Sequence, residues 1–135
     1  MLKAMVAKGP GGRVIVMDSI TQLTPKDAGA IVVSGSHGGA SSGEIALGVP
    51  FRAVIFNDAG IGKDSAGIVA LEMLQARGIA GAVVAHTSAR IGDARDAWEN
   101  GVLSRCNAAA EKLGLKAGAP LRGALESLLS SPGAN

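Results

Sequence analysis

Four short apolar segments without a charged residue recur along the chain, and they restrict its fold more than any other feature. They lie at residues 14–16, 31–33, 53–56 and 80–85, separated by glycine-rich turns or by segments of helical periodicity. Such runs are typical of strands that are buried on both faces of a sheet. The pattern predicts an α/β fold: a small three-layer sandwich with a mostly parallel sheet of about four strands and a Rossmann-like topology.

An extra edge strand is expected at the N-terminus. Residues 3–7 are mostly apolar, and a turn of glycine and proline at residues 9–12 separates them from the first apolar segment. Proline and glycine mark turns, so this region favours a β-hairpin whose first arm is an edge strand.

Two longer helices are predicted from capping residues and apolar periodicity. The first covers about residues 65–77, with Asp64 as its N-cap, and the second covers residues 93–114, with Cys106 on its buried stripe. Glycine disfavours a helix interior. Either a neighbouring backbone therefore packs closely against Gly101, or the second helix breaks at that position.

A length of 135 residues is typical of one domain, and the hydrophobic fraction of 47% is sufficient for one core. We expect a single α/β domain over residues 1–130 and a flexible tail over residues 131–135. Aromatic residues make up only 2%, so aliphatic side chains must build the core. The single cysteine, Cys106, excludes an internal disulfide and is expected to be a small core residue.

Charge and hydropathy argue against two classes of partner. The net charge of +2 comes from 13 basic and 11 acidic residues that are scattered along the chain, without the basic and aromatic clusters of nucleic-acid surfaces. The chain also lacks an apolar run of about 18 residues, and we expect no secretion signal because the apolar stretch within residues 1–8 is too short for one. We therefore expect no nucleic-acid partner, no membrane association and a cytoplasmic location.

Polar residues gather where the predicted strands end, and the carboxyl ends of parallel strands share one edge of a sheet, where ligands bind. Three of them are candidate catalytic residues: His37, Asp58 and His86. We expect His37 to act as the acid/base group, Asp58 to orient it and His86 to be a second proton-transfer group. The alternative for each is structural: a histidine that fixes a loop, a turn-forming aspartate and a hydrogen-bonded strand end.

The glycine- and serine-rich loop at residues 34–42 is expected to bind an anion. Ser41 and Glu44 have the spacing of a capping box, which would leave ordered N–H groups at a helix start. The loop lacks the P-loop and dinucleotide signatures, so its glycines alone indicate little. Arginine and lysine side chains suit carboxylate or phosphate binding. The candidate substrate-binding residues are Ser34, Ser36, Gly38, Gly39, Ser41, Asn57, Lys63, Ser88 and Arg90.

These residues predict an enzyme that acts on a small anionic metabolite by hydrolysis or acid/base proton transfer, without an organic cofactor. The alternative is a non-catalytic ligand-binding or regulatory subunit of a larger complex. No metal site is assigned, although the two histidines and Asp58 could in principle hold a divalent ion. We expect a homo-oligomer or a subunit of a complex, because a second copy could complete the site or cover an edge strand.

Overall fold

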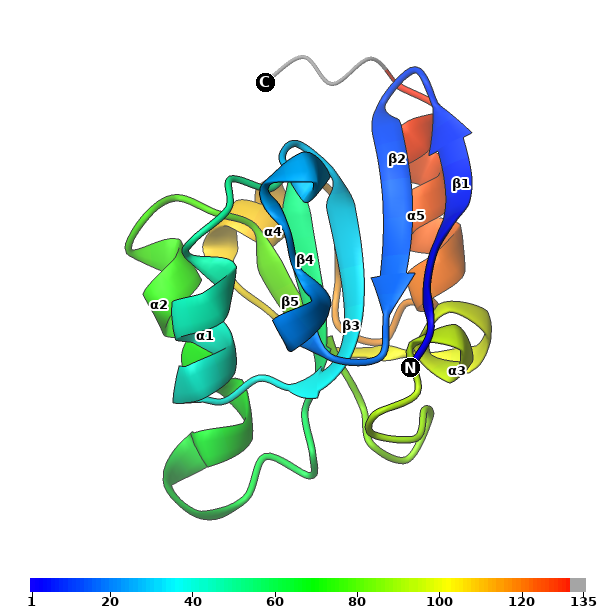
Figure 1. Cartoon of the computed structure of the whole chain (residues 1–135). Coiled ribbons are helices and arrows are strands. Elements are labelled where there is room, and N and C mark those ends of the chain that lie inside the picture. The colour runs from blue at the N-terminus through cyan, green and yellow to red at the C-terminus, as the bar shows by residue number, and fades with distance from the viewer. Residues whose placement is uncertain (132–135) are drawn as a thin grey trace.

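A mixed sheet of six strands runs through the molecule in the computed structural model, which describes residues 1–131 (Figure 1). The strands are β1 (Lys3–Gly9), β2 (Gly12–Met17), β3 (Ile31–His37), β4 (Ala53–Asn57), β5 (Gly81–Val84) and β6 (Leu103–Cys106). They follow one another in the sheet in chain order. The strands from β2 to β5 pair in parallel, whereas β1 pairs with β2, and β6 with β5, in antiparallel register.

The predicted mostly parallel, Rossmann-like sheet of about four strands is wrong, because an antiparallel pair stands at each edge of this six-stranded sheet. The strand order also lacks the reversal at which doubly wound sheets open a crevice for ligands. The N-terminal hairpin is confirmed: Gly9 pairs with Gly12 across the turn, and β1 is an edge strand.

The helices are shorter than the periodicity indicated. They are η1 (Ile20–Gln22), η2 (Pro25–Asp27), α1 (Ala40–Ala46), η3 (Lys63–Ile68), α2 (Val69–Gln75), α3 (Ala94–Asn100), α4 (Ala108–Lys112) and α5 (Leu121–Leu129). The single helix predicted over residues 65–77 is wrong in its first half. Asp64 lies inside η3 with a φ of 56° and does not cap α2.

The long helix predicted over residues 93–114 is also wrong, because its middle forms the edge strand β6. Helix α3 breaks at Gly101, where a Cβ would lie 2.4 Å from the oxygen of Ala97 and 2.9 Å from the Cγ1 of Val84. Close packing and a helix break therefore coincide at this glycine. Cys106 is the last residue of β6 and is partly buried against the core.

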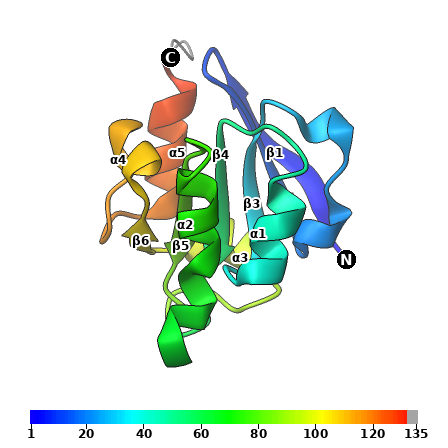
Figure 2. The same ribbon diagram turned by 90° about the vertical axis from the view of Figure 1, so that its left-hand side faces the viewer.

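Two separate cores cover the faces of the sheet. Val14 and Val16 of β2 face a core shared with α3 and α5, whereas Ile15 and Met17 face a core shared with α1 and α2. This alternation follows from the strand geometry, in which successive side chains point to opposite faces. Figure 2 shows α1 and α2 side by side on one face of the sheet. The carboxyl ends of the parallel strands therefore emerge between two layers of helices.

Among residues 1–131, no helix is long and apolar enough to cross a membrane. Most of the predicted tail, residues 132–135, lies outside the described residues.

Candidate functional site

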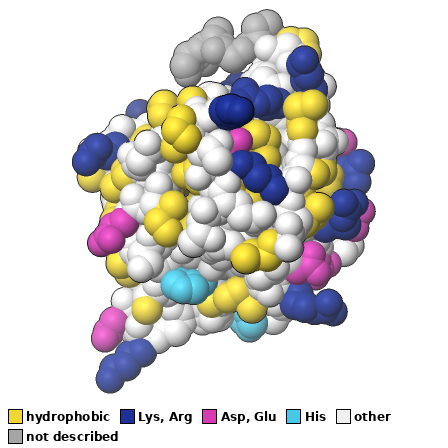
Figure 3. Space-filling view, viewed as in Figure 1, with side chains coloured by type: hydrophobic (Ala, Val, Ile, Leu, Met, Phe, Trp, Pro, Cys, Tyr) yellow, Lys and Arg dark blue, Asp and Glu magenta, His cyan; other side chains and the backbone are white. Residues whose placement is uncertain are grey.

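The three candidate catalytic residues lie at one edge of the sheet. His37 is the last residue of β3, Asp58 directly follows β4 and His86 follows β5 by two residues. Figure 3 shows the two histidines, in cyan, at the surface on the lower side of the molecule, where the parallel strands of Figure 1 end. The strand topology therefore places the candidates on a common rim.

Asp58 and His86 form a hydrogen-bonded pair within this rim. The Nδ1 of His86 lies 3.3 Å from Oδ1 of Asp58, and the backbone N–H of His86 donates to the same oxygen at 3.0 Å. The Asp58 side chain is 6% exposed, whereas that of His86 is 54% exposed. A buried carboxylate thus holds an imidazole that is open to solvent.

Two further donors hold the carboxylate of Asp58. The backbone N–H of Gly60 donates to Oδ1 at 2.8 Å, and the hydroxyl of Ser104 on β6 donates to Oδ2 at 2.7 Å. Burial raises the pKa of Asp58, but the hydrogen bonds from Ser104, Gly60 and His86 outweigh it and hold that pKa below its ordinary value. Asp58 is therefore ionised at neutral pH.

The charge of Asp58 determines which nitrogen of His86 carries a proton in the neutral ring. An ionised carboxylate only accepts hydrogen bonds, so Nδ1 donates to it and Nε2 carries the lone pair. Gly60 lies beneath the ring, since a Cβ there would be 3.5 Å from its Cε1. No hydrogen bond from the described residues reaches Nε2. The pair therefore presents a basic nitrogen at an exposed position.

His37 stands apart from this pair. It lies on β3 and His86 follows β5, so two strand spacings, roughly 10 Å, separate their chain positions. The His37 Nδ1 accepts a hydrogen bond of 3.0 Å from the backbone N–H of Gly39. The His37 ring thus holds the turn that follows it, which agrees with a structural role for this residue. Asp58 orients His86 and not His37.

The glycine loop has little free backbone for an anion. The N–H of Gly38 donates to the oxygen of Asn57 at 3.0 Å, and the N–H of Gly39 is used by His37. Helix α1 begins after Gly39, so Ser41 lies within it, exposed, and the predicted capping box with Glu44 is wrong. A Cβ at Gly38 would lie 2.6 Å from the oxygen of Gly67. This glycine therefore serves close packing of two loops.

Two predicted binding serines have internal partners. The Ser34 Oγ is buried and accepts from the N–H of Ser36 at 2.9 Å, and the Ser36 Oγ accepts from the N–H of Ile20 at 3.0 Å. The contact of Ser36 with Ile20 joins the end of β3 to η1. Both hydroxyls therefore stabilise the backbone at this edge of the sheet.

Asn57 and Ser88 connect the loops around the pair. The buried Asn57 amide donates to the oxygen of Ala89 at 2.9 Å and accepts from the N–H of Ala59 at 2.8 Å. The Ser88 hydroxyl donates to the oxygen of Ala85 at 2.7 Å and accepts from the N–H of Val102 at 2.9 Å. Both side chains thus support the loops that carry Asp58 and His86.

The two predicted cations of the site are exposed. Lys63 begins η3, and the Arg90 guanidinium lies 4.0 Å from the carboxylate of Asp93, with 81% of its side chain exposed. Both lie in loops that follow the parallel strands, on the rim that carries the pair. Both side chains are therefore open to solvent.

Ser104 is the site residue that sequence reasoning missed. Residues 103–106 fall within the segment predicted as a long helix, so nothing in that pattern placed this serine at the rim. The contact with Asp58 joins residues 46 positions apart.

The rim offers no metal centre within the described residues. Nowhere in residues 1–131 do three or more histidine, cysteine or acidic side chains meet in a group that could hold a metal ion. Comparison with protein-family models, with curated proteins and with solved structures finds no match to this chain.

Proposed function

We propose that this protein is an enzyme that uses His86 as a general acid/base on a small anionic metabolite, with Asp58 as its positioning residue. The observation that carries the proposal is the pairing of a buried, ionised carboxylate with an exposed imidazole across 3.3 Å. A carboxylate on Nδ1 orients the ring and stabilises the imidazolium that forms when Nε2 takes a proton.

The surroundings of Nε2 favour two reaction types. Nε2 can take a proton from an acidic C–H or O–H of the substrate and return it elsewhere, or it can take a proton from a water that attacks the substrate. The Ser104 hydroxyl donates to Asp58 and lies on the far side of the carboxylate from His86, so it is not the nucleophile. Proton transfer and water-mediated hydrolysis therefore remain the two reactions of the proposal.

The cations of the rim support an anionic substrate. Lys63 and Arg90 lie in the loops after β4 and β5, the same two strands that precede Asp58 and His86. A carboxylate or phosphate bound by these side chains would bring the reacting part of a small molecule to Nε2.

The second candidate is a non-catalytic ligand-binding or regulatory subunit. One observation favours it: two adjoining hollows, which share Arg52 and Lys112 in their linings, lie at the opposite edge of the sheet from the pair. Sites for small molecules are usually concave. A protein that only binds a ligand would need these hollows and would not need the acid/base pair at the other edge.

The experiment that tests the proposal follows proton transfer and hydrolysis directly. Proton transfer is read by NMR as exchange of solvent deuterium into small carboxylates and phosphate esters, and hydrolysis as release of product. Replacement of His86 by Gln should lower the rate by about 10²- to 10⁴-fold, and Asp58→Asn should lower it by less. Arg105→Gln, an exposed change on β6, is the matched control.

Two results would contradict the proposal. One is an unchanged rate for the His86→Gln variant that folds as the wild type does by circular dichroism. The other is a wild-type protein that binds these compounds without turning any of them over, which supports the binding-subunit alternative.

A further inference from the structure

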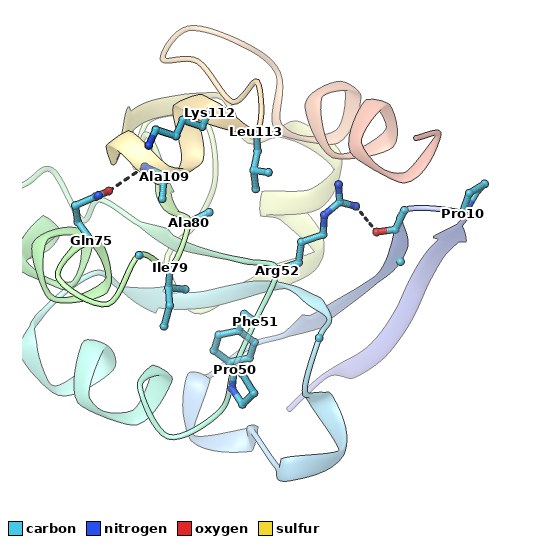
Figure 4. Close-up of a pocket in the computed structure, with 14 residues that line it drawn as sticks. Pro10, Pro50, Phe51, Arg52, Gln75, Ile79, Ala80, Ala109, Lys112 and Leu113 are labelled. Carbon is cyan, nitrogen blue, oxygen red and sulfur yellow. Dashed lines mark hydrogen bonds between the residues drawn. The ribbon is translucent and has the colours of Figure 1, made fainter. Parts of the chain in front are cut away.

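A hollow in the described surface lies where the parallel strands begin, at the edge of the sheet opposite His86. Its volume is about 940 Å³, and it lies between the β1–β2 turn, the residues before β3 and β4, the end of α2 and helix α4 (Figure 4). Pockets that bind small molecules have volumes of about 300–1,000 Å³. The hollow is therefore large enough for a metabolite of moderate size.

The charges that line the hollow are all positive. Arg52 and Lys112 are its charged residues, and no aspartate or glutamate belongs to its described lining. An adjoining hollow of about 450 Å³ shares Arg52, Lys112 and Leu113 and likewise has no acidic residue in its described lining. The two cations thus stand at the junction of both hollows, where an anion meets no opposing charge.

Arg52 is held in place by backbone oxygens. Its Nη1 donates to the oxygen of Gly11 in the β1–β2 turn and to that of Leu128 in α5 at 3.2 Å. No described carboxylate forms an ion pair with it. The Nε and Nη2 groups, which form the side of the guanidinium that binds carboxylates and phosphates in bidentate fashion, have no partner among the described residues.

Lys112 adds a second, exposed cation. It is exposed near the end of α4, and neither a hydrogen bond nor an ion pair with another described residue occupies its ammonium group. In Figure 4, Lys112 and Leu113 lie across the hollow from Pro50 and Phe51. The lysine can therefore approach a ligand from the side opposite to this apolar pair.

The rest of the lining is apolar. Phe51, Ile79 and Leu113 are partly buried hydrophobic residues that border the hollow, and glycine and proline supply much of the remainder. An inorganic ion would leave this apolar surface uncovered, whereas an organic anion covers it and gains the free energy of that burial.

We propose that this hollow binds a small organic anion. The ligand has a phosphate or carboxylate group and carries an aromatic or branched aliphatic group. The anionic group contacts Arg52 and Lys112, and the apolar group covers Phe51 and Ile79. This site lies at the other edge of the sheet from Asp58 and His86. Its test is therefore independent of the proposed acid/base function.

The experiment uses phenyl phosphate as the probe, with inorganic phosphate and benzyl alcohol as its charged and apolar halves. Binding to the full chain is measured by titration calorimetry at 150 mM salt, and its position by amide NMR shifts. We expect phenyl phosphate to bind at least about tenfold more tightly than either half, because both kinds of contact contribute to one affinity. The shifted amides should include those of Gly11, Arg52, Ile79 and Lys112.

Matched variants decide which residues bind the probe. Lys112→Gln should weaken binding of phenyl phosphate by about fivefold and Arg52→Gln by more, since a bidentate arginine is the stronger contact. Lys116→Gln and Arg95→Gln are exposed controls outside both linings and should leave affinity unchanged. Because Arg52 also holds the β1–β2 turn, Lys112→Gln is the decisive variant.

The proposal is overturned by any of three results. These are affinity for phenyl phosphate no greater than for inorganic phosphate or benzyl alcohol, amide shifts confined to another surface, and an equal loss of affinity in Lys112→Gln and Lys116→Gln.

Discussion

The hydroxyl of Ser104 donates a 2.7 Å hydrogen bond to the Oδ2 of Asp58 and so links the edge strand β6 to the loop after β4. The other carboxylate oxygen receives the contacts from Gly60 and His86. Each oxygen of the buried carboxylate therefore has its own donors, and β6 contributes directly to the proposed site.

Removal of the Ser104 hydroxyl should destabilise the fold. In Ser104→Ala, Oδ2 of the buried carboxylate loses its protein donor, and we expect the free energy of unfolding to fall by about 1–3 kcal/mol. Urea denaturation measures the change. Ser127→Ala, at an exposed position of α5, is the control and should change stability by less than about 0.5 kcal/mol. Equal stability of the two variants would contradict the role of Ser104.

Acid should weaken the fold through Asp58. Because the pKa of Asp58 is lowered in the folded state, its carboxylate contributes stability above the unfolded pKa of about 3.9, and this contribution is lost as pH falls through the folded pKa. The stability advantage of the wild type over Asp58→Asn should therefore be constant from pH 7 to about pH 5 and shrink below pH 4. Urea midpoints at each pH measure it. An advantage that grows in acid would contradict the direction of the shift.

The Asp58→Asn comparison isolates one carboxylate. Asp18 and Asp27 also have lowered pKa values. Burial raises each pKa, but backbone hydrogen bonds and nearby positive charges outweigh it at Asp18, and backbone and side-chain hydrogen bonds with the charge of Lys3 outweigh it at Asp27. Both remain in the variant. Its stability should therefore still decline in acid, but less steeply than that of the wild type.

Gly35 should tolerate no side chain. A Cβ at this position would lie 2.5 Å from the oxygen of Asp18, 2.7 Å from the carbonyl carbon of Gly92 and 2.8 Å from the nitrogen of Asp93, all of them backbone atoms. We expect Gly35→Ala to lower the free energy of unfolding by about 3 kcal/mol or more, since the backbone must shift. Thermal unfolding measures the loss.

Gly123 provides the matched control for Gly35. It lies inside α5, and a Cβ there would meet no atom within 4 Å. Alanine favours helix over glycine, so Gly123→Ala should raise stability by about 0.5–1 kcal/mol. A similar loss of stability in both variants would show that contact with the backbone of Gly92 and Asp93 is not what requires glycine at position 35.

The Cys106 thiol should react slowly in the native protein. Burial raises the pKa of Cys106 to about 11, with a smaller contribution from the charge of Glu111, so little thiolate exists at neutral pH. At pH 8, a disulfide reagent should modify the folded protein at least about 100-fold more slowly than the urea-unfolded chain. Comparable rates in the two states would contradict a protonated, sheltered thiol.

Short-range sequence patterns were sufficient for the elements whose residues carry their own signal. Each charge-free apolar run overlaps one strand, from β2 to β5, and the glycine and proline of residues 9–12 form the hairpin turn. The parallel pairing of these strands then places Asp58 and His86 at one edge, as expected. These features depend on side-chain polarity and turn chemistry that are local in the chain.

Contacts between distant segments decided the rest. Residues 103–106 fit a helical stripe as well as a strand, and pairing with β5 selects the strand, which adds an antiparallel edge to the sheet. The same pairing brings Ser104 to Asp58, while local hydrogen bonds in the glycine loop leave His37 apart from them. Periodicity reports which side of an element is apolar. Which segment covers that side depends on the packing of the whole chain. For this reason only the tertiary structure shows that Asp58 orients His86 and not His37.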